Sequence, residues 1–187
     1  MKLSQFILSI LILCVIVYGQ EYQVDKAAEN SVKFISDAPI EDFEGITDKI
    51  DGYLYLPPDN DPESSEIYFE VDLRTLDTGI GLRNQHMREN YLETDKYPYA
   101  VFEGKVESLS SEDDTIYVEI EGKMKIHGTT KDFPISGKMI KTQKGFFVTS
   151  LFDVKLTDFN IDVPKFMFLK IDETMKLEVK FYLKEVE

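Results

Sequence analysis

The stretch Met175-Lys-Leu-Glu-Val-Lys-Phe-Tyr-Leu-Lys184 alternates between apolar and polar side chains almost without exception. Its odd positions from Met175 to Leu183 are all apolar, whereas Lys176, Glu178 and Lys180 occupy even positions. A period of two is that of a β-strand with one buried face and one solvated face. We therefore predict a strand over residues 175–184 and a chain that is mainly β.

The same alternation recurs along the chain, and polar or proline-rich turns separate its repeats. The predicted strands cover residues 31–36, 43–56 with a break near Asp51-Gly52, 67–73, 100–106, 116–126, 133–139, 146–156 and 175–184. Residues 57–62, 110–114 and 144–145 supply turns. One stretch departs from the β period, because residues 83–93 are good helix formers and Leu82, Met87 and Tyr91 share a helical face. We predict a short helix that crosses between strands.

About eight strands with one apolar face each form either a sandwich or a closed barrel. Closure removes exposed strand edges, and a barrel of this size either fills with side chains or holds one small ligand. Four of the predicted inward positions are small: Ala100, Gly104, Gly122 and Gly137. They leave room for a cavity or mark bulges that bend the strands.

The first nineteen residues have the pattern of a secretory signal peptide. Lys2 is the only charged residue before Glu21, and residues 6–17 are a nearly continuous apolar run that is short for a membrane span. We predict a cleaved leader over 1–19 and one domain over 20–187, in a periplasmic or secreted protein with no integral membrane span after cleavage. A retained anchor and lipidation at Cys14 are the alternatives. Cleavage removes Cys14, the only cysteine, and with it any disulfide or thiolate chemistry.

The chain carries 35 acidic and 21 basic residues, and 43% of its residues are hydrophobic. Loss of Lys2 with the leader leaves 20 basic residues and a charge of −15. This apolar fraction is too high for a disordered acidic chain, so a packed domain is expected. Nucleic acid and anionic membrane surfaces are disfavoured as partners, because both are bound by clusters of Lys and Arg.

Groups suited to catalysis are few. The two histidines are His86, in the predicted helix, and His127, which precedes a Gly-Thr-Thr turn and is expected to bond backbone there. No HxH, HExxH or G-x-S-x-G pattern occurs in the sequence, and acidic clusters such as residues 112–114 are typical of turns. We expect no enzyme, no metal and no cofactor.

Two separated blocks of sequence resemble the YceI-like family. The first comprises Asp72-Leu-Arg-Thr-Leu-Asp-Thr-Gly79, Arg83-Asn-Gln-His-Met87 and Lys96-Tyr-Pro-Tyr-Ala-Val-Phe102; the second is Gly122-Lys-Met-Lys-Ile-His-Gly-Thr-Thr-Lys131. The order and spacing of both blocks match, and the likeness extends from about residue 22 to residue 184. Two positions depart from the pattern: Asn84 stands where aspartate is common, and Met124 where leucine is usual. Because Asn84 replaces the aspartate, an Arg-Asp pair at the start of the helix is in doubt.

The resemblance implies an extended, eight-stranded, lipocalin-like antiparallel β-barrel that accommodates a long isoprenoid or another amphiphilic lipid. The predicted inward positions form the expected ligand-binding wall, although the same pattern also describes a packed core. These positions are Phe69, Val71, Ala100, Phe102, Val118, Ile120, Met124, Ile126, Phe133, Ile135, Val179 and Phe181. Arg83, His86 and Tyr97 are expected to frame the cavity mouth or to hold the helix to the barrel.

Two hypotheses follow for function. The first is a lipid-binding protein that sequesters or carries its ligand without a covalent step, since burial of a long hydrocarbon needs few polar groups. The second is a ligandless barrel that binds another protein through its acidic outer face. A filled interior favours the second hypothesis. The sequence leaves open which lipid is bound and whether two barrels associate as a homodimer.

Overall fold

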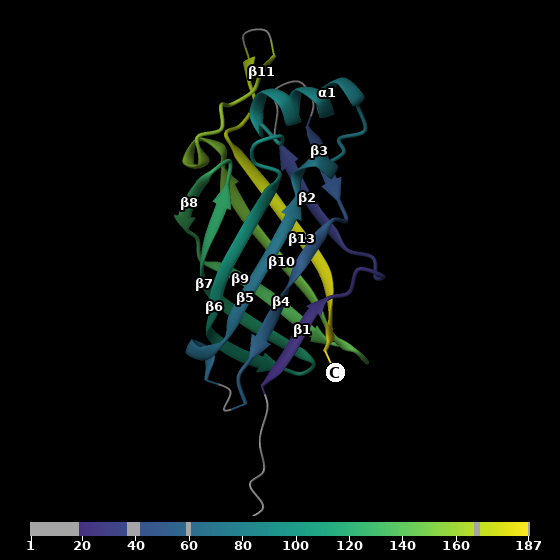
Figure 1. The fold of residues 1–187 in the computed structure, drawn as a ribbon, viewed down its shortest axis with the longest axis vertical. Coiled ribbons are helices and arrows are strands. Elements are labelled where there is room, and N and C mark those ends of the chain that lie inside the picture. The colour runs from purple at the N-terminus through teal and green to yellow at the C-terminus, as the bar shows by residue number, and fades with distance from the viewer. Residues whose placement is uncertain (1–18, 37–41, 59–60, 167–168, 187) are drawn as a thin grey trace, which may run out of the picture.

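The computed structural model describes residues 19–36, 42–58, 61–166 and 169–186, which form an elongated antiparallel barrel (Figure 1). Within these residues, eight strands form a closed ring. In ring order they are β1 (Gln20–Val24), β4 (Ile50–Leu56), β5 (Glu66–Asp72), β6 (Tyr99–Glu112), β7 (Thr115–Ile126), β9 (Ile135–Lys141), β10 (Gly145–Lys155) and β13 (Thr174–Glu185), which pairs with β1. The predicted mainly β fold with an eight-stranded barrel is confirmed. Residues 1–18 of the predicted leader lie outside the described residues.

Strand β13, the strand with the clearest alternation, has different neighbours along its length. Its last residues pair with β1 in the register Leu183 to Val24, whereas residues 175–180 pair with β2 (Ser31–Ser36). Strand β3 (Phe43–Thr47) extends this sheet, and Ile46 forms a bridge with Asp77. The barrel wall is therefore completed by β1 at one end and by β2 and β3 at the other.

Several predicted strand boundaries are wrong. The ring includes β1, which was not predicted, and leaves out β2, which was. The predicted strand over 43–56 is two strands, and the break falls at residues 48–49. Gly52 lies inside β4 with φ of 138°, where a Cβ would lie 2.0 Å from the Tyr68 carbonyl oxygen. Only glycine therefore fits this position without strain.

The predicted strand over 133–139 and the predicted turn over 110–114 also change. A short strand, β8 (Thr129–Asp132), pairs with β7 outside the ring, and β9 begins only at Ile135. Pro134 lies between the two strands and interrupts the pairing, because proline has no N–H to donate to a ladder. Strands β6 and β7 extend as far as Glu112 and Thr115, so the turn shrinks to two residues.

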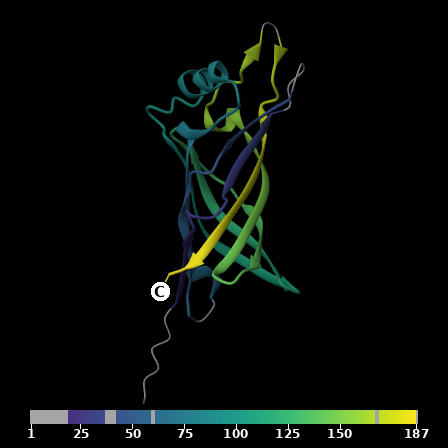
Figure 2. The same ribbon diagram turned by 90° about the vertical axis from the view of Figure 1, so that its right-hand side faces the viewer.

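Helical segments gather mainly at one end of the barrel. The short helix α1 (Gly81–His86) continues into a π-helical turn, η3 (Met87–Tyr91), where the sequence predicted one helix over 83–93. The hairpin of β11 (Lys165–Phe166) and β12 (Leu169–Lys170) lies at the same end (Figures 1 and 2). Three 3-10 turns complete the described helices: η1 (Pro62–Ser64), η2 (Leu73–Thr75) and η4 (Leu156–Phe159).

The opposite end of the barrel is closely packed. Val24, Val106 and Leu183 are each no more than 3% exposed, and the Tyr22 ring meets Phe146 edge-on with centroids 5.0 Å apart. We call these five residues the closed end. Their close packing fixes the barrel around β1, and three of them, Val106, Phe146 and Leu183, also line the cavity described next.

Candidate functional site

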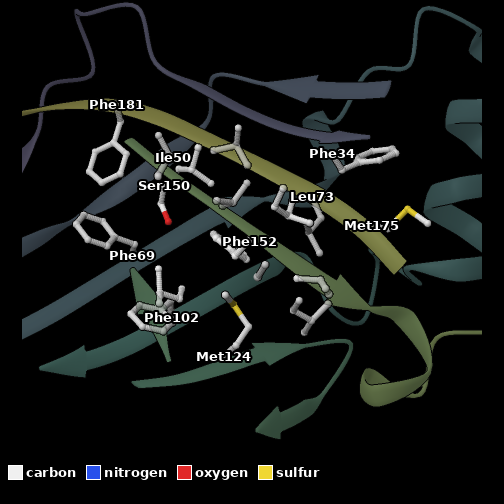
Figure 3. Close-up of a pocket in the computed structure, with 18 of the residues that line it drawn as sticks. Phe34, Ile50, Phe69, Leu73, Phe102, Met124, Ser150, Phe152, Met175 and Phe181 are labelled. Atoms are coloured by element: carbon white, nitrogen blue, oxygen red, sulfur yellow. The ribbon is translucent and has the colours of Figure 1, made fainter. Parts of the chain in front are cut away.

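The barrel encloses an elongated cavity of about 890 Å³ (Figure 3). Side chains along β13 from Met175 to Leu183 line it. Eight residue steps of about 3.3 Å correspond to about 26 Å along that strand. Because barrel strands tilt by about 35–45°, this stretch covers about 20 Å along the barrel axis, over which a volume of about 890 Å³ has a mean cross-section of about 45 Å². The cavity is therefore long and narrow, which suits a chain-like ligand better than a compact one.

The cavity wall is almost entirely apolar. Among the described residues, the polar side chains on the wall are those of Arg83, His86, Tyr91 and Ser150. The Ser150 hydroxyl, seen in Figure 3, already donates to the Ser136 carbonyl oxygen at 2.7 Å. The middle of the cavity therefore offers hydrocarbon contacts and almost no free hydrogen-bonding group, which favours an apolar ligand.

Most of the predicted ligand-binding positions lie on this wall. They are Phe69, Val71, Ala100, Phe102, Val118, Ile120, Met124, Ile126, Ile135, Val179 and Phe181. Six of them are only half-buried although they face inward, because the space in front of them is open: Phe69, Val71, Ala100, Ile120, Ile126 and Val179. The sequence did not decide between a packed core and a cavity, and in the structure the interior is hollow.

Phe133 was predicted on this wall and lies elsewhere. It follows the end of β8, and its ring packs against Phe152 and Phe159 with centroids 5.7 and 6.4 Å apart. The predicted alternation fails here because Pro134 separates two strands, so residues 133 and 135 do not share one continuous strand.

The small inward residues have two different roles. Ala100 and Gly137 line the cavity. Gly104 and Gly122 face each other across β6 and β7 and make room for neighbours, since a Cβ on Gly122 would lie 2.3 Å from the Phe102 ring. The irregularity in this pair of strands falls between Val106 and Ser108, at neither glycine.

The prediction missed many wall residues that the same alternation contains. Met175 and Leu177 precede Val179 on the inward face of β13, and the even positions of β10 from Phe146 to Val154 line the cavity. The strand period was the signal for both sets, but it does not show where along a strand the interior is open. Leu82, Met87 and Tyr91, the predicted apolar helix face, also line the cavity.

The end of the cavity beneath α1 is open to the surface, and we call it the mouth. Ile80 and Leu82 line the cavity there and are 52% and 63% exposed, and His86 on the same helix is also exposed. The rings of Phe34 and Phe43 form the facing rim. At the opposite end of the cavity, Leu109 on β6 lines the wall and is 44% exposed.

Arg83 both borders the mouth and holds α1 to the barrel. Its Nε and Nη2 donate to the side-chain and backbone oxygens of Thr78 at 2.9 and 2.7 Å. Its guanidinium carbon also lies 4.6 Å from the centre of the Phe43 ring, a cation–π contact with β3. The sequence suggested that Arg83 frames the mouth or holds the helix, and in the structure a single position of the side chain does both.

Asn84 stands where aspartate is common in the family, and it forms hydrogen bonds at the start of the helix without an Arg-Asp pair. Its Oδ1 accepts from the Thr78 N–H and hydroxyl at 2.8 and 2.7 Å, while its Nδ2 donates to Asp77 Oδ1 at 2.7 Å. Hydrogen bonds from Asn84 and from the Gly79 N–H lower the pKa of Asp77. An aspartate at residue 84 would lack the donor that this carboxylate receives.

Tyr97 lies away from the mouth and supports the other end of the helical segment. Its ring meets His127 edge-on at 4.7 Å, and a Cβ on Gly128 would lie 2.7 Å from it. His127 is in the predicted turn, but its Nε2 pairs with the Glu93 carboxylate at 3.1 Å, so the expected backbone bond is wrong. Hydrogen bonds from Lys96 and then from His127 lower the pKa of Glu93.

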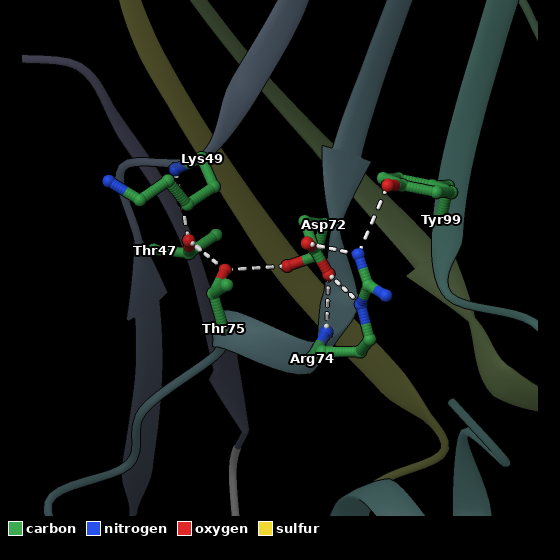
Figure 4. A network of polar contacts seen from close by, with 6 residues as sticks. All are labelled: Thr47, Lys49, Asp72, Arg74, Thr75 and Tyr99. Carbon is green, nitrogen blue, oxygen red and sulfur yellow. Dashed lines mark hydrogen bonds and ion pairs between the residues drawn. The ribbon is translucent and has the colours of Figure 1, made fainter. Parts of the chain in front are cut away.

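A second polar network joins the ends of β3 and β5 (Figure 4). Arg74 donates to both Asp72 carboxylate oxygens, at 2.8 and 2.7 Å, and to the Tyr99 hydroxyl at 3.0 Å. The Thr75 hydroxyl donates to the Asp72 carbonyl and also contacts Thr47. The hydrogen bonds from Arg74 lower the pKa of Asp72. Asp72, Arg74 and Thr75 thus join neighbouring strands of the wall, and none of the three lines the cavity.

We next considered metal-binding groups and the two histidines. In the part of the chain that the structure describes, no group of three His, Cys, Asp or Glu side chains is placed to hold a metal ion. His86 and His127 lie in separate settings, one exposed on α1 and the other against Tyr97 and Glu93. The arrangement suits binding by burial.

The family comparison agrees with this architecture. A model of the YceI-like domain matches residues 22–183, nearly all of the predicted mature chain. This chain belongs to the YceI-like domain family. No curated protein sequence matches it.

Solved structures similar to this YceI-like chain include BcnA of Burkholderia cenocepacia, with a TM-score of 0.69 and 16% identity over 84% of this chain and 98% of BcnA. A polyisoprenoid-binding domain of Saccharophagus degradans, implicated in plant cell wall breakdown, has a TM-score of 0.67 and 16% identity over 89% of this chain and 98% of that domain. The YceI protein of Campylobacter jejuni has a TM-score of 0.58 and 14% identity over 76% and 84% of the two chains. At these low identities, the TM-scores show a shared fold and no more. No helix among the described residues is long and apolar enough to span a membrane.

Proposed function

We propose that this YceI-like protein binds a long-chain isoprenoid or a similar amphiphilic lipid inside the barrel and sequesters or carries it without a covalent step. The observation that supports this most is the narrow, apolar cavity of about 890 Å³. Burial contributes about 0.8 kcal/mol per methylene, so a chain of about fifteen methylenes gains on the order of 12 kcal/mol before entropic costs. The printed description of the Saccharophagus degradans relative as polyisoprenoid-binding also supports the proposal.

The hollow interior supports the lipid-binding hypothesis over the ligandless one. A ligandless interaction module would gain nothing from an open apolar core, because unfilled space forfeits packing contacts. Wall residues such as Val71 and Val179 remain half-buried around the cavity, which supports a ligand as their missing neighbour.

Extraction of purified protein with organic solvent, followed by mass spectrometry, tests this function. We expect a long-chain lipid in amounts close to one per chain. A barrel that is repeatedly empty, and that also takes up no added polyprenol, contradicts the proposal.

We further propose that the mature protein is periplasmic or secreted and begins at Gln20. Strand β1 starts at this residue and pairs it with Leu56, so the predicted mature chain contains the whole ring-closing strand. The intact mass of protein recovered from the periplasm or medium should correspond to residues 20–187. A mass that includes the leader, or protein found only in the cytoplasm, contradicts this.

A further inference from the structure

The mouth presents two large apolar side chains to the surface. Ile80 and Leu82 are 52% and 63% exposed, and both also line the cavity, so the apolar surface runs without interruption from outside to inside. Leu82 belongs to α1, whose start is fixed to the barrel by Arg83 and Asn84 through Thr78. The exposed leucine is therefore held on an anchored helix.

The neighbouring hairpin lies at the same end of the barrel. Strands β11 and β12 place Phe166 opposite Leu169 in register and flank them with Lys165 opposite Lys170. Pro164 and Ile171, at the base of this hairpin, line the cavity, as does Leu82 on α1. The hairpin and α1 thus border the same opening (Figures 1 and 2).

We propose that the mouth docks on the surface of a lipid bilayer, with Ile80 and Leu82 entering its interfacial region, so that a lipid passes between bilayer and cavity. This inference rests on the proposed function. A long hydrocarbon crosses water at a cost that grows with every methylene, and a mouth pressed into the bilayer avoids that step. Apolar side chains around an opening are the surface that such contact requires.

The charge of the protein indicates which bilayer it meets. The predicted mature chain has a net charge of −15, and in the sequence around the hairpin Asp162 and Asp172 balance Lys165 and Lys170, so no basic cluster offsets that charge there. Attraction to anionic headgroups is therefore not the source of binding, and insertion of apolar side chains has to supply it. Vesicles of zwitterionic phosphatidylcholine are accordingly the probe.

Flotation of the mature chain with phosphatidylcholine vesicles tests the docking. We expect the protein to float with the vesicles, and Leu82→Glu to reduce the bound fraction about tenfold because it places a charge where a leucine enters the interface. Ile80→Glu should act in the same direction. Leu151→Glu is the matched control, since Leu151 on β10 is 73% exposed and does not line the cavity. It should float as the parent does.

Three results would overturn the docking proposal: no flotation of the parent chain, equal losses for Leu82→Glu and Leu151→Glu, or flotation only with anionic lipid. Circular dichroism and gel filtration of each variant separate lost docking from lost folding. Solvent extraction distinguishes this proposal from the one on which it rests. A chain that carries lipid but does not float contradicts docking alone, whereas a chain that floats but never yields or takes up lipid contradicts the lipid-carrying function.

Discussion

The two ends of the barrel are built from the same alternating strands but are packed differently. At the closed end, all five residues are at most 9% exposed, and three of them, Val106, Phe146 and Leu183, also line the cavity. At the mouth, the same strands surround an opening, and polar contacts at the rim hold α1 in place. We therefore expect a nearly fully buried residue of the closed end to contribute more stability than a half-buried residue of the cavity wall.

Two leucines on β13 test this division and should give the largest effect. Leu183 is 2% exposed at the closed end, whereas Leu177 is half-buried against the open cavity. We expect Leu183→Ala to lower the free energy of unfolding by about 3 kcal/mol and Leu177→Ala by about 1 kcal/mol, because the second site already lacks neighbours on one side. Urea denaturation measures both. Equal losses would show that the two ends are packed alike.

A smaller effect is expected at the rim, where Asn84 donates to Asp77. Asn84→Asp removes this donor and places two carboxylates together, so it should lower the melting temperature at pH 7 by a few degrees. The difference from the parent should shrink at low pH as the carboxylates take up protons. Asn84→Ala is the uncharged comparison, which removes the donor and also the oxygen that accepts from Thr78, so its loss should not depend on the charge of residue 84. Equal losses in the two variants, unchanged by pH, would exclude charge repulsion as the cause.

The smallest effect concerns Asp72, whose pKa is lowered mainly by the hydrogen bonds from Arg74. A carboxyl whose pKa is lower in the folded state contributes stability above its unfolded pKa of about 3.9 and loses it as pH falls through the folded value. Asp72→Asn should therefore lower the melting temperature slightly at pH 6 and flatten its fall below about pH 4. Melting curves from pH 2 to 7 measure this. An unchanged acid limb would contradict the assignment.

The alternation of apolar and polar residues was enough to predict most strands and most of the residues on the cavity wall. The inward face of β13 and most of the predicted wall follow directly from alternation, because the side-chain period of a strand is two wherever it is paired on one buried face. The YceI-like resemblance then supplied the closed barrel. Alternation could not show that Val179 is half-buried whereas Leu183 is almost fully buried, since both are inward apolar residues of one strand.

The missed features depend on contacts between distant segments. Strand β1 has only Tyr22 and Val24 as inward residues, too few to show a period, and its place in the ring comes from pairing with β4 and β13. The position of Tyr97 depends on His127, and that of Phe133 on Pro134 and η4. Local sequence contains none of this information, because propensity and period describe neighbours along the chain.

The central claim, that the cavity holds one long-chain lipid, is tested most directly by native mass spectrometry of the purified protein and two variants. Ala100 faces the cavity from β6, and Val101, the next residue, points to the opposite face of the strand. We predict a single lipid adduct on the parent and on Val101→Phe, and at least an approximately tenfold loss of the adduct on Ala100→Phe, whose ring fills the cavity. Absence of any adduct, or an adduct indifferent to Ala100→Phe, would contradict it.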